Sequence, residues 1–378
     1  MPLLFPVVGA VTVLIFFLVA EKISGSAVVA SIASLFLATA GVDAIFTAGV
    51  TKQTYAEPLF MVSILLLLWK TDRRSGALFT ITSVTLALSH HATALLLLVV
   101  AASIISVDSV LLKRRGESIG MKPLLLVISG GATLAYLLVY ADAGLGQFSG
   151  LVTVQTALLA LAFLTIFVTP VAYHAISHPT KLLLVEGGIV LVLAAGILAI
   201  GTRVTLISSA PAVSPTLLYS AVPYVLLGVL AIFGYRIIHV AKGRRNFVFV
   251  ASWLSAVLAF GFLAVFAGVP DGLPILYRLL AFIGAPAIIL ASLALQGALG
   301  GTRRRGLVKV AVVAVILLIS VSSAYQTYAA SIQKESLLGG QWAYQQSDLT
   351  GAQWMSANSA SRNFNLSGDV RMQYLLTD

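Results

Sequence analysis

Long apolar runs alternate with short polar links along most of this chain, and the basic residues gather in every second link. A bilayer core about 30 Å thick needs about 20 apolar residues for each crossing helix, and runs close to that length recur here. Four links are strongly basic: Lys70-Thr71-Asp72-Arg73-Arg74, Lys113-Arg114-Arg115, Lys242-Gly243-Arg244-Arg245 and Arg303-Arg304-Arg305. This alternation is the positive-inside pattern of a polytopic helical membrane protein.

The predicted fold is therefore all-α, with about 11–12 transmembrane segments in residues 1–325. Residues 326–378 are polar, and we expect them to form an extracytoplasmic tail that begins a soluble domain. Basic links in the cytoplasm place the N-terminus outside the plasma membrane as well. The predicted spans are 3–20, 26–41, 56–69, 77–88 with 92–112, 123–141, 154–175, 182–201, 216–238, 247–268, 277–299 and 308–325.

The stretch 77–112 departs from simple alternation, because basic links lie at both of its ends. Residues 77–88 make only about 18 Å of helix, too little to cross a bilayer core of about 30 Å. We therefore predict a hairpin of one short and one longer helix. Its crest, His90-His91, would face protein or a water-filled cavity below the outer surface.

Composition excludes several classes of function. Hydrophobic residues make up 59% of the chain and charged residues 10%, against roughly 25% charged in soluble proteins. The net charge of +10 fits topology and attraction to anionic membrane lipids rather than nucleic-acid binding, since the basic links lack interleaved aromatic residues. The chain has no cysteine, which rules out disulfides and cysteine nucleophiles. No Walker motif and no HExxH motif is present.

Ionisable residues at or within the membrane are costly, so they are candidates for function. Those predicted to lie on the outer side are Asp43, Lys52, Glu57, His90, His91, Asp142, Arg203, Asp271 and Arg278. Asp43 and Glu57 bracket one outer link, which also holds Lys52. Either acid could act as a general base toward an acceptor hydroxyl, or bind a divalent cation such as Mg²⁺ or Mn²⁺. The alternative is that Glu57 caps a helix starting at Pro58.

The histidines and the arginines also have two possible roles each. His90 and His91 could donate to a phosphate, or their ring nitrogens could cap the two helix ends at the crest. Arg278, at an outer helix end, could bind a lipid-linked phosphate or extend to the head groups, and Arg203 has the same choice. Inner residues such as Asp108 are expected to pair with the basic links. No residues are singled out as metal ligands.

Several short motifs follow one another in an order that resembles one family of enzymes. They are Thr51 to Phe60 with Glu57-Pro58, Leu86 to Thr93 with the histidines, Tyr277-Arg278, Ser347 to Trp354, and Gly368 to Arg371. The chain resembles the membrane region of archaeal or bacterial glycosyltransferases of the GT-C superfamily. That resemblance implies transfer of a sugar from a polyprenyl-phosphate carrier on the outer face.

Members of that superfamily usually carry their key acidic residue in an outer loop after the first span, and this chain enters its first span at once. We therefore expect a chain truncated at both ends, in which Glu57, Asp43 and Arg278 are secondary site residues. The alternatives are a transporter or flippase of lipid-linked glycans, or a non-catalytic membrane scaffold.

Overall fold

The computed structural model describes residues 4–40, 52–69, 72–114, 120–139, 215–241, 244–266, 272–300, 305–332 and 350, and this part of the chain is helical apart from short links. Its helices are α1 (Leu4–Ser24), α2 (Ala27–Thr39), α4 (Lys52–Leu68), α5 (Arg73–Ser89), α6 (His91–Arg114), α7 (Lys122–Val139), α11 (Pro215–Ala241), α12 (Arg244–Phe266), α13 (Gly272–Gly300) and α14 (Arg305–Ile332). The predicted all-α fold is confirmed. The predicted spans 154–175 and 182–201 lie outside the described residues.

Helix length and apolar composition make this a polytopic membrane protein. In the described part of the chain, four stretches are long and apolar enough to cross a bilayer: Val7–Ser24, His91–Lys113, Ala281–Leu299 and Gly306–Tyr325. Five shorter apolar helices accompany them. The outward sides of the peripheral helices are apolar as well, as at Leu307 and Val321 of α14, which are 74% and 63% exposed. Apolar side chains directed outward suit a surface solvated by lipid tails.

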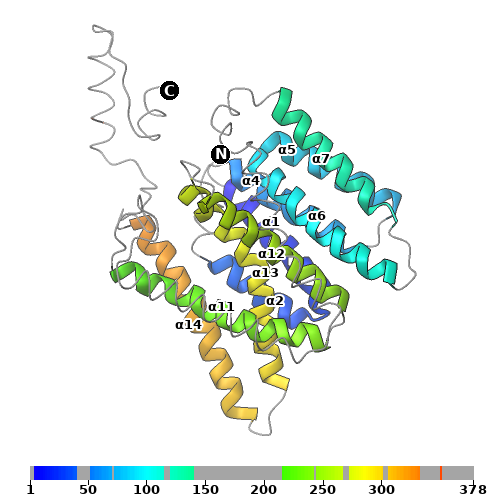
Figure 1. Cartoon of the computed structure of the whole chain (residues 1–378). Coiled ribbons are helices and arrows are strands. Elements are labelled where there is room, and N and C mark those ends of the chain that lie inside the picture. Colours follow the sequence, from blue (N-terminus) through cyan, green and yellow to red (C-terminus); the bar gives the residue numbers. More distant parts are fainter. Residues whose placement is uncertain are drawn as a thin grey trace.

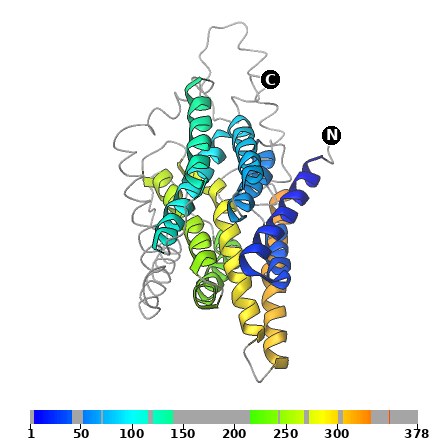
Figure 2. The ribbon, with the colours of Figure 1, turned by 90° about the vertical axis from the view of Figure 1, so that its right-hand side faces the viewer.

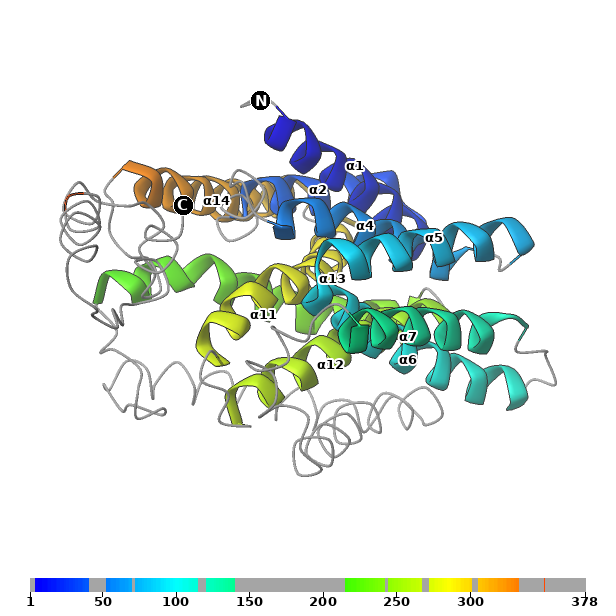
Figure 3. The ribbon, with the colours of Figure 1, turned by 90° about the horizontal axis from the view of Figure 1, so that it is seen from above.

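Helix α13 lies at the centre of the bundle. It contacts α1, α2, α11, α12 and α14, and in Figure 1 and Figure 3 it runs between the α2 side and the α12 side of the molecule. Helices α5, α6 and α7 form a neighbouring group that joins the rest through α4 and α12. Most helices run in roughly the same direction or its reverse, as seen in Figure 2. Ring contacts of Phe60 in α4 with Trp253 in α12 and Phe282 in α13 join these three helices in the interior.

Contacts between distant segments bring the basic links together at one end of the bundle. Nζ of Lys22, at the end of α1, lies 5.8 Å from the ring centre of Trp69, at the end of α4. Asn246, at the start of α12, donates to the carbonyl of Ile23 over 2.8 Å. Gln296, near the end of α13, donates to Ser26 Oγ over 2.7 Å. We call the end where these residues meet the basic end.

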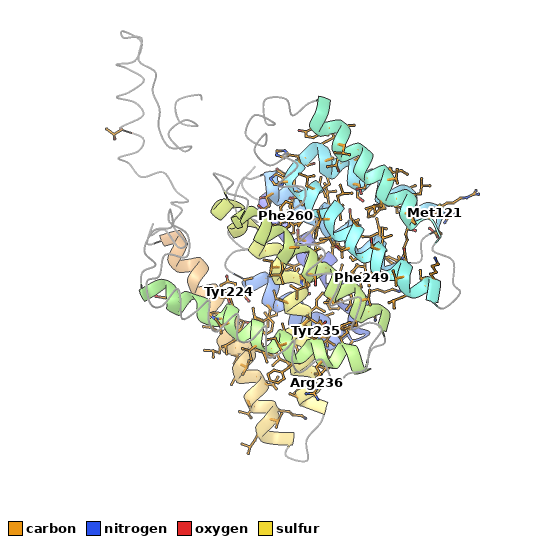
Figure 4. All side chains as sticks on the ribbon, viewed as in Figure 1. Met121, Tyr224, Tyr235, Arg236, Phe249 and Phe260 are labelled. Atoms are coloured by element: carbon orange, nitrogen blue, oxygen red, sulfur yellow. The ribbon has the colours of Figure 1, made fainter. Side chains whose placement is uncertain are left out.

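The links around α5, α6 and α7 meet in the same way. Gly76, at the start of α5, lies against the side chains of Met121 and Leu125 at the start of α7 (Figure 4 labels Met121). Asp108, near the end of α6, pairs with Lys122 at the start of α7. The start of α5 and the end of α6 therefore lie at one end of the molecule. This confirms the predicted hairpin, and the expected pairing of Asp108 with a basic residue.

The helix boundaries correct three details of the prediction. Helix α5 begins at Arg73 rather than residue 77, because Asp72 and Ser75 form a capping box there. Hydrogen bonds from Ser75 hold the pKa of the Asp72 carboxyl below its usual value. Helix α14 continues past residue 325 to Ile332, and α4 begins at Lys52, not residue 56. Glu57 is therefore inside α4, and the reading of Glu57 as a cap for a helix starting at Pro58 is wrong.

Helices α11 and α13 approach each other closely at Gly234. A Cβ atom added to Gly234 would lie 1.7 Å from the carbonyl oxygen of Leu290, which no van der Waals contact allows. Such close approach through glycine is common between membrane helices. We therefore expect Gly234→Ala to force the helices apart and lower the free energy of unfolding by about 1–3 kcal/mol, as overpacking does.

Thermal unfolding of the purified chain in detergent measures this effect, and Gly131→Ala in α7 is the matched control. A Cβ on Gly131 meets nothing within 4 Å, so its replacement should be neutral or stabilise the helix slightly. Equal unfolding temperatures for the two variants would contradict the close packing of α11 on α13.

Candidate active site

Glu57 is a buried carboxyl group in the second turn of α4. The residue is 2% exposed, and Gln53, one turn earlier and 4% exposed, donates from Nε2 to Glu57 Oε1 over 2.9 Å. Burial of a carboxylate away from water costs several kcal/mol, so a group of this kind is rarely retained in a membrane span without a function. Gln53 partly offsets that cost and fixes the orientation of the carboxyl group.

Three aromatic rings join α4, α12 and α13 just below Glu57. The ring of Phe60 packs edge-on against that of Phe282, with centroids 4.9 Å apart, and lies 6.2 Å from the ring of Trp253. We call these three residues the aromatic cluster. Phe60 and Trp253 are fully buried and Phe282 is 4% exposed. The cluster therefore fixes the register of α4 relative to α13.

That register brings two predicted site residues to the same level. Glu57 precedes Phe60 by three residues in α4, and Arg278 precedes Phe282 by four in α13. Both helices run from the opposite end toward the basic end, so both residues lie about one turn farther from the basic end than the cluster. The backbone of Arg278 belongs to α13, while its side chain lies outside the described part of the structure.

We call His90, the C-cap of α5, and His91, the first residue of α6, the histidine link. Nδ1 of His90 accepts a hydrogen bond from the backbone N–H of Thr93 over 3.3 Å and lies 2.7 Å from the Thr93 hydroxyl. The backbone N–H of His90 also donates to the carbonyl of Leu86. His90 therefore ends α5 and caps the start of α6, which confirms the capping reading for this residue. The imidazole of His91 stacks on that of His90 with centroids 5.9 Å apart.

The contact with the Thr93 N–H fits one tautomer of His90, whereas the role of Nδ1 toward the Thr93 hydroxyl depends on the tautomer. A neutral ring whose Nδ1 accepts from the Thr93 N–H carries its proton on Nε2. Both histidines are only partly buried.

The histidine link lies near the level of Glu57. Ser63 Oγ of α4 and Thr82 Oγ1 of α5 are hydrogen-bonded at 3.1 Å, and the two helices run in opposite directions. Glu57 precedes Ser63 by six residues in α4, and Leu88 follows Thr82 by six residues in α5. Both therefore lie about 9 Å farther from the basic end than the Ser63–Thr82 hydrogen bond. His90 follows Leu88 by two residues. Glu57, the backbone of Arg278 and the histidine link thus occupy the same half of the bundle.

The remaining predicted site residues are not brought into this arrangement. Lys52 is the first residue of α4, but its side chain is not among the described residues, and Asp43 and Arg203 lie outside them altogether. Within the described ranges, no three His, Asp or Glu side chains come together as metal ligands.

Sequence reasoning missed Gln53 and Trp253. Gln53 precedes Glu57 by four residues, the spacing at which two helical side chains meet, and this signal was available. Tryptophan in membrane helices favours the two interfaces, whereas Trp253 follows the basic start of α12 by nine residues. Figure 4 labels Phe249 and Phe260, which precede and follow Trp253 along α12. A tryptophan in mid-span is a signal that could have identified it.

Comparison with known proteins gives little further support. No family model and no curated protein matches the sequence. Among solved structures, the chain is similar to the Archaeoglobus fulgidus oligosaccharyltransferase, crystallised in a complex with Zn and sulfate, at 15% identity and a TM-score of 0.43. The alignment covers 99% of this chain and 45% of the other, so the chain spans less than half of that protein's length. A TM-score this low does not establish a shared fold.

Proposed function

We propose that this chain forms the transferase site, or part of it, of a membrane enzyme that transfers a sugar from a polyprenyl-phosphate carrier. The observation that carries the proposal is the buried carboxyl group of Glu57, held by Gln53 at the level of Arg278 in the half of the bundle away from the basic end. A carboxyl group that can take a proton, an amide that orients this carboxyl group and an arginine that can bind phosphate suit a reaction that moves one proton and releases a phosphate.

The proposed reaction joins an acceptor hydroxyl to the anomeric carbon of the carried sugar. The new bond forms from the acceptor oxygen while the bond between the anomeric carbon and the phosphate oxygen breaks, and its electron pair leaves with the polyprenyl phosphate. Glu57, as general base, takes the proton from the acceptor hydroxyl. Asp43 is the second candidate for this role.

The departing phosphate needs positive charge and hydrogen-bond donors. Arg278 would supply a planar guanidinium group, which binds phosphate oxygens in pairs. His90 would donate its Nε2–H while Nδ1 caps α6, and His91, Lys52 and Arg203 are further candidates for binding the donor. We assign no step to a metal ion.

The orientation that we propose places the basic end in the cytoplasm and the site on the extracytoplasmic side of the plasma membrane. The positive-inside rule supports this orientation, since Lys22 and the basic links meet at one end. A sugar donor carried by polyprenyl phosphate would then reach the site from the lipid.

Reconstitution of the full chain in proteoliposomes tests the proposal against transport. Polyprenyl-phosphate mannose and polyprenyl-phosphate glucose, each labelled in the sugar, serve as donors, and a membrane extract of the source cells supplies acceptors. We expect free polyprenyl phosphate to appear as label leaves the lipid fraction. Movement of intact labelled donor across the bilayer, without release of polyprenyl phosphate, would instead identify a flippase.

A further inference from the structure

The indole N–H of Trp253 is a buried donor that the described structure leaves unused. Trp253 is 0% exposed, and its Nε1 has no hydrogen-bond partner in the described residues. A buried tryptophan N–H normally finds an acceptor, because leaving it unpaired costs about 1–3 kcal/mol. The donor therefore calls for an explanation in the chemistry of this region.

Five buried serine hydroxyls without partners among the described residues are easier to explain. They are the hydroxyl oxygens of Ser34, Ser83, Ser103, Ser252 and Ser320. A serine hydroxyl in a helix can rotate toward the carbonyl one turn earlier, as Ser292 does with Ile288. The indole N–H of Trp253 lies too far along its side chain to reach the carbonyls of its own helix. Its acceptor must come from another element or from a ligand.

The position of Trp253 points to the proposed site. Its ring lies 6.2 Å from that of Phe60, which is one turn from Glu57 in α4, and Phe60 in turn packs on Phe282, one turn from Arg278 in α13. The indole N–H therefore belongs to the member of the aromatic cluster that α12 contributes. The side chain of its neighbour Phe60 offers a ring and no acceptor oxygen.

We propose that Trp253 binds the sugar donor by donating its indole N–H to an oxygen of the phosphate head group. This inference rests on the proposed function and adds α12 to the helices that form the site. The phosphate then has a neutral donor on α12 in addition to Arg278 on α13. A hydrogen bond to a charged oxygen is worth more than one between neutral groups, so the buried N–H is well matched to this partner.

Because Trp253 is fully buried, the proposal includes a movement of the turn that carries Glu57. Pro58 lies inside α4 and has no N–H, so one internal hydrogen bond of the helix is missing between the first turn and the rest. Proline positions are the usual places at which membrane helices bend. Displacement of the turn with Gln53 and Glu57 away from Phe60 would open a path from the outer half of the bundle to the indole.

Two measurements on the full chain in nanodiscs test this proposal. The first follows the ¹⁵N-labelled indole signals of the four tryptophans, with Trp253→Phe identifying the signal of interest. Adding polyprenyl phosphate should move the Trp253 indole proton downfield, whereas polyprenol should not. Adding inorganic phosphate tests whether a phosphate group alone is enough for binding. A shift of the Trp253 indole signal with inorganic phosphate also supports the proposal. An unmoved Trp253 signal with polyprenyl phosphate would overturn it.

The second measurement is sugar transfer by Trp253→Phe, which keeps a ring against Phe60 but removes the N–H. We expect kcat/KM to fall about 10- to 100-fold, mainly through KM, as for loss of a hydrogen bond to a charged group. The matched control is Trp69→Phe at the basic end, with unchanged kinetics. Kinetics for Trp253→Phe equal to those of the control would contradict the proposal. An inactive parent chain would refute the transferase function alone, because the indole shift is measured without turnover.

Discussion

Replacement of Glu57 with glutamine is expected to lower the rate of sugar transfer about 10²- to 10⁴-fold, the usual contribution of a general base. Glutamine has nearly the same shape as glutamate, and its carbonyl oxygen can still accept the hydrogen bond from Gln53. The variant should therefore fold normally and lose only the ability to take a proton. Initial rates of polyprenyl-phosphate release in proteoliposomes measure the effect.

The control for this prediction is Glu21→Gln, the same chemical change in α1 close to Lys22 and the basic end. It should leave the rate unchanged. If Glu57→Gln were as active as Glu21→Gln, Glu57 would not be the base, and Asp43 would remain as the candidate.

The second large effect concerns the buried ion pair between Asp108 and Lys122. Their side chains are only 7% and 8% exposed. Asp108→Ala removes the partner of a buried ammonium group, so we expect the free energy of unfolding to fall by about 3–5 kcal/mol. Thermal unfolding in detergent measures the loss, together with size-exclusion chromatography to detect aggregation.

A double variant separates the charge from the packing. Asp108→Leu combined with Lys122→Met replaces the pair with apolar side chains of similar length, and such replacements are often neutral or stabilising. We expect it to recover most of the stability lost in Asp108→Ala. If it were as unstable as the single variant, the cost would come from lost packing rather than from an uncompensated charge.

The fold was largely predictable because bilayer physics leaves few choices. Apolar length identified nearly all the helices, and the basic links correctly placed both ends of the α5–α6 hairpin together. The start of α4 was not predictable from the same rules. Pro58 was assigned to a first helical turn, but membrane helices tolerate proline in their interior, and α4 extends back to Lys52.

The candidate site was predictable only as a set of residue types. Glu57 and His90 were identified because ionisable groups in spans are rare. Their arrangement depends on which helices touch, and apolar spans carry almost no information on their neighbours. The contact between Phe60 and Phe282, which sets the level of Glu57 against Arg278, joins residues more than 200 positions apart. Phenylalanines in different spans cannot be told apart from the sequence, so the sequence does not show which pair is in contact.

The central claim is that the candidate site and the basic end face opposite sides of the membrane. Because the chain has no cysteine, single substitutions provide unique labels for a membrane-impermeant maleimide. Arg74→Cys and Lys113→Cys report on the basic end, and Lys52→Cys reports on the start of α4. We expect Lys52→Cys to be labelled in intact cells, and the other two only after permeabilisation. Labelling of all three from the same side would contradict the account.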